Sequence, residues 1–215
     1  ALYLNTTGTE NVAVGSLALD ANTTGQRSTA VGHNALGSIT TESDCTAVGH
    51  DCLPVTTGQR NTGTGSFAGG LTSTGQYNTF LGYAAGYGNT TGSENTAVGD
   101  DALGQNTTAS TNTAIGYHAL FTNTTGAGNV AVGGAALLSN NTTNYNTAVG
   151  KGALQLNTES SNTAVGYNCL TSNTTGDRNT AVGTNALDAN TTSDKNTALG
   201  YDSLTANTTG SDNTA

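Results

Sequence analysis

The chain has 215 residues, 30 of them glycine, and it carries a formal net charge of −9 with only 9% charged residues. This charge argues against a nucleic-acid-binding protein, which needs basic patches to neutralise phosphates. No apolar run approaches the roughly 20 residues that cross a bilayer, so membrane insertion is not expected either.

One short unit repeats along the whole chain. Residues 1–10 form an incomplete copy, residues 11–212 contain the complete copies, and residues 213–215 begin another. The consensus is N-T-A-V-G-x-x-A-L-x-x-N-T-T-G-x-x, and the step is 17 residues except for steps of 16 after Cys45 and after Asn146. A unit this short cannot hold two helices with their turns. The repeat therefore predicts a single all-β array, a parallel β-solenoid of about twelve 17-residue coils.

Each coil is predicted to have two extended legs joined by two corners. The T-A-V-G segment forms the first leg, and the residues around A-L form the second. A glycine ends the first leg of every complete copy, which suits a corner that needs positive φ or a close approach of backbones. The N-T-T-G segment supplies the other corner, and both short copies have lost a residue near it. The twelve structural glycines are Gly15, Gly32, Gly49, Gly65, Gly82, Gly99, Gly116, Gly133, Gly150, Gly166, Gly183 and Gly200.

The alanine and the valine of the first leg must point to opposite faces, because side chains alternate along a strand. Both positions are apolar, and a strand that is apolar on both faces is buried on both. We therefore expect several chains to associate, with the small alanines at the contact between chains. The valines are expected to form one buried column that includes Val14, Val31, Val98, Val149, Val165 and Val182.

The repeat departs from its consensus between Asn61 and Tyr87. Gly69 and Gly86 replace the leucine of the second leg, and Phe80 replaces the alanine of the first. Interiors pack densely, so vacated volume is normally refilled. Phe80, with or without Phe67, is predicted to fill the space of the missing leucines. If the alanine face is the contact between chains, copies of Phe80 should also meet near the axis of the assembly.

The two residues after the invariant glycine vary most between copies, which indicates a solvent-facing edge. No coil combines a histidine with a nucleophile and an orienting carboxylate, so we predict no enzyme, no catalytic residue and no cofactor. The acidic clusters lack the spacing of a calcium loop, so we predict no metal ligand. Solvent-facing decoration of the shaft is the favoured interpretation of this edge. The alternative is contact of its exposed tyrosine and histidine side chains with a cell-surface glycan or receptor. The candidate contacts are His33, His50, Tyr83, Tyr117, His118, Tyr167 and Tyr201.

The cysteines and the glycosylation patterns each leave two interpretations open. Cys52 and Cys169 stand where other copies have alanine, and small buried hydrophobes are the favoured interpretation. A disulfide between Cys45 and Cys52 is the alternative. Ten asparagines fit the N-x-[ST] pattern of glycosylation. The favoured interpretation is that N-T-T is simply the second corner of the coil.

Three segments carry a resemblance to a known family. The segments "STAVG" at 28–32 and "NTAIG" at 112–116 resemble the S-x-A-I-G element of trimeric autotransporter adhesin heads, and "YNCL" at 167–170 resembles the leg that follows it. The N-T-A-V-G…A-L…N-T-T-G spelling also looks like repeats in bacteriophage tail fibres. The resemblance implies a left-handed β-roll with three chains around an axis, forming a homotrimeric rod. The unit here is longer than the head unit, and the extra residues fall in the N-T-T-G half.

The resemblance implies the shaft of an extended trimeric fibre, such as a viral tail fibre, that presents or contributes to host or surface attachment. The alternatives are a bacterial cell-surface adhesin head and an ice-binding solenoid. Ice binding calls for outward threonines at i and i+2 on a flat strand, whereas the paired threonines of N-T-T belong to a corner. We expect a location on the virion or cell surface. No capping coil is visible at either end, so the array is expected to be a fragment of a longer fibre.

Overall fold

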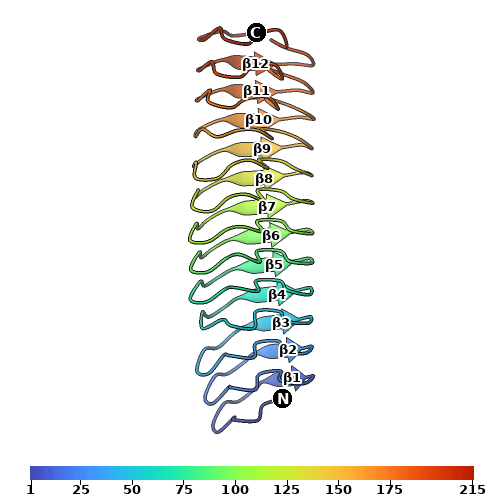
Figure 1. Ribbon diagram of the computed structural model, residues 1–215, viewed down its shortest axis with the longest axis vertical. Helices are drawn as coiled ribbons and strands as arrows, with labels where there is room; N and C mark the ends of the chain where they lie inside the picture. Colours follow the sequence, from blue (N-terminus) through green and yellow to red (C-terminus); the bar gives the residue numbers. More distant parts are fainter.

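The computed structural model describes all 215 residues and contains twelve strands and no helix. The strands pair in chain order into one twelve-stranded sheet. Figure 1 shows the coils stacked along a single axis, with the two termini at opposite ends. The chain is therefore a parallel β-solenoid, as the repeat predicts. The strands are β1 (Val12–Val14), β2 (Thr29–Val31), β3 (Thr46–Val48), β4 (Thr62–Thr64), β5 (Thr79–Leu81), β6 (Thr96–Val98), β7 (Thr113–Ile115), β8 (Val130–Val132), β9 (Thr147–Val149), β10 (Thr163–Val165), β11 (Thr180–Val182) and β12 (Thr197–Leu199).

All neighbouring strands are parallel and in register, including those that flank the two 16-residue steps. Thr46 of β3 pairs with Thr62 of β4, and Thr147 of β9 pairs with Thr163 of β10. A slip of one residue would exchange the inner and outer faces of a strand. The missing residues are therefore absorbed outside the strands, as expected for a loss at a corner.

The prediction of a second extended leg is wrong, because the residues around A-L form turns. In the coil of β6, Asp101 has φ 52° and Leu103 has φ 55°, and the same two positions have positive φ throughout the array. The left-handed conformation costs roughly 1–2 kcal/mol per residue. Stacking offsets this cost, since each coil hydrogen-bonds the next through bonds such as Leu103 N to Ala119 O at 3.0 Å. Of 136 backbone hydrogen bonds, 114 involve at least one residue outside the strands, and many of these join a turn to the turn of the next coil.

The interior of the solenoid is lined by the alanine of each strand and by the A-L pair of each turn. Ala114, Ala119 and Leu120 of one coil are all fully buried, and 32 such residues form one continuous cluster along the rod. The core therefore runs the full length of the array, and it belongs to a single chain.

The prediction that the valines form a buried column inside the coil is wrong, because they lie on the outer face of the chain. The valine position faces outward, and exposure reaches 57% at Val14 and 36% at Val165. The alternation of side chains allows only one of the two apolar positions to point inward, and in coils whose turn carries its leucine the interior leaves room only for the smaller one. Even a methyl group at Gly63 of β4 would lie 2.6 Å from the Cys52 sulfur and 3.1 Å from Leu53 Cδ1. The alanines accordingly lie inside, and the valines occupy the outer face.

Phe80 fills the space of the missing leucines, as the sequence suggests. Its side chain is fully buried, and a Cβ on Gly69 would lie 2.8 Å from its ring. A Cβ on Gly86 would overlap the same ring. The expectation that copies of Phe80 meet at an axis between chains is wrong, because Phe80 lies inside the coil. Phe67, in contrast, is only half-buried and lies at the outer corner.

Two ladders of buried asparagines join successive coils, one formed by the asparagine of N-T-T and the other by the leading asparagine of the unit. Asn106 Nδ2 donates to Asn89 Oδ1 at 2.7 Å, and Asn123 Nδ2 donates to Asn106 Oδ1 at 3.0 Å. The leading asparagine of most units forms the second ladder, in which its side-chain oxygen accepts a hydrogen bond from a backbone N–H of the next coil. Asn129 N, for example, donates to Asn112 Oδ1 at 2.9 Å. Burial explains why these carboxamides must be paired, since an unpaired buried amide costs roughly 1–3 kcal/mol. Seven of the ten glycosylation patterns have their asparagine in this interior, namely Asn22, Asn89, Asn106, Asn123, Asn140, Asn173 and Asn190.

Candidate functional site

The outer face of the sheet, here called the strand face, consists of two columns of side chains. The first column is threonine in most coils, with Val12 and Val130 as exceptions. The second column is aliphatic except for Thr64, and no charged residue lies in either column. Large contiguous apolar strips are uncommon on the surfaces of monomeric proteins. Its aliphatic members are Val14, Val31, Val48, Leu81, Val98, Ile115, Val132, Val149, Val165, Val182 and Leu199.

The first corner, defined as the two residues after the invariant glycine, is set by the backbone of that glycine. Gly116 has φ 131°, which favours glycine, and a Cβ there would lie 2.7 Å from the carbonyl carbon of Gly133 in the next coil. Positive φ and close approach therefore both require glycine here. The sharp bend turns the next two residues out of the coil, and their side chains stack on those of the coils above and below.

Three of the predicted surface residues belong to one aromatic and histidine run along the first corner. The His33 and His50 rings stack with centroids 5.1 Å apart, and His50 meets Phe67 edge-on at 5.5 Å. Phe67 then meets Tyr83 edge-on at 6.0 Å and Tyr87 at 6.5 Å. The run thus extends over four successive coils.

The remaining predicted surface residues lie farther along the rod. Tyr117 stacks on His118 at 3.9 Å, and His118 stacks on Phe121 at 4.7 Å. Tyr167 and Tyr201 are exposed by 49% and 75%, and no ring stacks on either. The seven candidates therefore form one run, one separate cluster and two single side chains.

A pocket of about 350 Å³ lies within the run, lined by Phe67, Tyr83, Ala84, Tyr87 and Asp101. It exists because Ala84 is small where the coils on either side carry Phe67 and Asp101. Gly70 contributes as well, since a Cβ there would lie 2.6 Å from the Tyr87 ring. Of these five residues, only Tyr83 was predicted from the sequence as a candidate surface contact. Comparing equivalent positions at the 17-residue period would have found Phe67 and Asp101.

Two histidines have a carboxylate partner that was not predicted. His50 Nδ1 lies 3.2 Å from Asp51 Oδ2, and His118 Nε2 lies 3.6 Å from Asp101 Oδ2. The second pair joins adjacent coils, so no search within one unit could reveal it. A carboxylate at such a distance can accept the imidazole N–H or bind the same cation as the nitrogen.

The three cysteines are free, fully buried thiols. The interpretation of Cys52 and Cys169 as small buried hydrophobes is confirmed, and the alternative disulfide between Cys45 and Cys52 is not formed. Burial raises the pKa of Cys52 and of Cys169 to about 12. It also raises the pKa of Cys45. None of the thiols is thus placed or ionised as a nucleophile would be.

Neither a protein-family model, nor a curated protein sequence, nor a solved structure matches the chain. The chain contains no helix with the length and hydrophobicity needed to span a bilayer. Functional inference therefore rests on the two surfaces described above, the strand face and the first corner.

Proposed function

We propose that the chain is the shaft of an extended homotrimeric fibre, such as a viral tail fibre, whose copies bury their strand faces against one another. The observation that carries this proposal is the aliphatic column of the strand face. It runs from β1 to β12 in strict register, so parallel copies can match it coil by coil. The assignment of three chains comes from the resemblance to trimeric adhesin heads. A cell-surface adhesin head would use the same assembly.

The energy of burial favours this association. Covering one of these partly exposed side chains contributes about 0.5–1.5 kcal/mol, a fraction of the value for full burial. About a dozen such side chains on each chain offset the roughly 4–15 kcal/mol lost in each association step. The sequence predicted alanine at the contact between chains and valine inside the coil. In this proposal the two positions are reversed, with alanine inside the coil and valine at the contact.

In this assembly the first corner is the part of the coil that meets other molecules. Its aromatic rings and the Asp101 carboxylate line a pocket suited to a sugar, which presents apolar ring faces and hydroxyl donors together. The shaft then contributes directly to surface attachment as well as extending the fibre.

Cross-linking of engineered cysteines tests the assembly. Val149→Cys places a thiol on the strand face, and Thr175→Cys places one on an exposed corner outside it. The native thiols are buried and do not interfere. A short bis-maleimide should link the chains of the Val149→Cys variant efficiently and those of the Thr175→Cys variant poorly. Equal linking of the two variants, or no linking of Val149→Cys, would refute the proposed contact.

Ice binding is a second candidate, because the strand face displays threonine in a regular array. The threonine of each T-A-V segment faces outward, and β4 presents Thr62 and Thr64 at i and i+2. Successive coils repeat the array at the interstrand spacing of about 4.8 Å. The expectation from sequence considered only the corner threonines of N-T-T. Thermal hysteresis by a monomeric chain would favour this candidate, since trimerisation covers the same face.

A further inference from the structure

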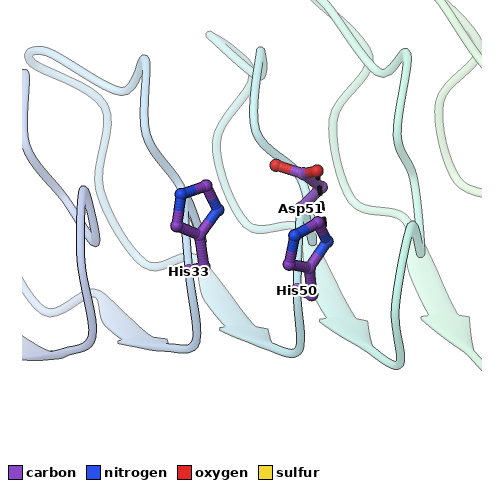
Figure 2. A group of neighbouring side chains, drawn as sticks. All are labelled: His33, His50 and Asp51. Carbon is purple, nitrogen blue, oxygen red and sulfur yellow. Dashed lines mark ion pairs between the residues drawn. The ribbon is translucent and has the colours of Figure 1, made fainter.

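His33, His50 and Asp51 form a compact group of potential ligands on two adjacent coils. One donor atom from each lies within 4.8 Å of the others. Figure 2 shows the two imidazoles projecting side by side from successive coils, with the Asp51 carboxylate beside His50. The arrangement follows from the repeat, because both histidines directly follow an invariant glycine and stack at the 17-residue period.

The Asp51 side chain is already oriented for this role. Asn34 Nδ2 donates to Asp51 Oδ1 at 2.8 Å, which leaves Oδ2 directed toward His50 Nδ1 at 3.2 Å. Metal ligands in proteins are commonly held by such outer hydrogen bonds. Asn34 occupies the same corner position as Asp51, one coil earlier, so the stacking of coils produces this bond too.

We propose that His33, His50 and Asp51 bind one divalent transition-metal ion, with Zn²⁺ as the reference ion. Imidazole suits zinc, nickel and copper, whereas calcium and magnesium prefer sites made of oxygen donors alone. Three protein ligands leave coordination positions for water. The net charge of −9 favours cation binding in general, but the two imidazoles give this group its selectivity for transition metals.

The donor atoms need only a small adjustment to hold an ion. Bonds of 2.0–2.1 Å at tetrahedral angles place donor atoms roughly 3.3 Å apart. The His50 and Asp51 donors are already close to that separation. Both histidines are exposed, so their rings can close the remaining distance without disturbing the core.

The position of the site gives the ion a structural role. The inner ladder of asparagines is interrupted here, because Ile39, Thr56 and Thr72 stand where most coils have the asparagine of N-T-T. Thr72 Oγ1 has no hydrogen-bond partner at all. A metal ion bridging His33 and His50 would tie two coils together in the segment that lacks these bonds.

Isothermal titration of the chelator-treated full chain with Zn²⁺ tests the proposal. We expect one ion per chain and a melting temperature that rises with Zn²⁺. His33→Asn, His50→Asn and Asp51→Asn should each weaken binding by roughly tenfold or more, the scale of losses at metal sites. His118→Asn is the matched control, since His118 also lies at the first corner beside a carboxylate, and it should bind like the parent chain.

Three results would overturn the proposal. These are no saturable Zn²⁺ binding, binding that survives His33→Asn and His50→Asn together, and loss of binding in His118→Asn. Saturation of the same site by Ca²⁺ or Mg²⁺ would also contradict it. The substituted side chains lie outside the core, so circular dichroism should show that every variant keeps the parent fold. The titration does not depend on the number of chains in the assembly.

Discussion

Phe80 on β5 lies against the backbone of Gly86 in the next turn, and its ring occupies volume that leucine side chains fill in other coils. Phe80→Ala should therefore leave a cavity and reduce the free energy of unfolding by about 3–5 kcal/mol. Chemical denaturation, with the exposed Tyr145→Ala as comparison, measures the difference. An unchanged denaturation midpoint would show that the ring does not support the core.

Restoring the consensus leucine at position 86 should be harmful alone and helpful in combination. Gly86 has φ 61°, close to the 55° of Leu103 at the equivalent position, so the backbone accepts leucine. The new side chain would overlap the Phe80 ring and cost roughly 1–3 kcal/mol or more. The double variant Phe80→Ala/Gly86→Leu should be more stable than the sum of the single effects predicts. Strict additivity in this cycle would contradict the packing described here.

The asparagine ladder should be sensitive to the loss of a single member. Asn106→Ala removes the donor to Asn89 Oδ1 and to Ala109 O, both near the buried ladder. It also removes one of the two acceptors of Asn123 Nδ2, which keeps its bond to Gly126 O. We expect a loss of about 2–4 kcal/mol, because unpaired buried amides are costly. Asn141→Ala, at an exposed asparagine two coils farther along, should change stability by less than about 0.5 kcal/mol. Equal effects at the two positions in denaturant titrations would argue against a buried ladder.

The three cysteines should resist alkylation in the folded chain. Burial keeps them protonated, and the pKa of Cys52 and Cys169 is raised to about 12. Iodoacetamide at about pH 8 should modify none of them in the native chain and all three in denaturant, because the thiolate is the reactive form. Mass spectrometry counts the adducts. Rapid modification of the native chain would show that the interior opens.

The same burial predicts a loss of stability at high pH. A raised pKa in the folded state stabilises the fold fully below the ordinary thiol value of 9.0, and this contribution is lost as the pH rises toward 12. The double variant Cys52→Ala/Cys169→Ala restores the consensus residue at both positions. Its melting temperature should fall less between these pH values than that of the parent. Identical alkaline profiles would mean that the thiols ionise equally in both states.

The period, the parallel register and the glycine corner could be predicted from the sequence, because each repeats in every copy. Which of the two apolar strand positions points inward could not be predicted. Alanine and valine are both apolar, and the space available inside the coil determines that alanine faces inward. The turn around Leu103 could not be predicted either, because leucine rarely adopts positive φ. The pairs of His118 with Asp101 and of His33 with His50 join residues one coil apart, so a single unit does not reveal them. Comparing equivalent positions across copies would have found both pairs.

Charge on the strand face should separate the chains without unfolding them. Val132→Glu places a carboxylate in the middle of the aliphatic column, where burial against another chain would be costly. Thr175→Glu adds the same charge at an exposed corner and serves as control. Size-exclusion chromatography should show smaller particles for Val132→Glu alone, with the circular dichroism of both unchanged. Assembly that tolerates Val132→Glu would place the contact elsewhere.

The mass of the particle in solution tests the central claim most directly. Sedimentation equilibrium of the unmodified chain at micromolar concentration should give three times the 21.3 kDa mass of one chain. Stable association is expected because the aliphatic column follows the rod and the strand face carries no charge. The number three is the proposal taken from the resemblance to trimeric adhesin heads. A particle of 21.3 kDa that does not associate on concentration would contradict the account.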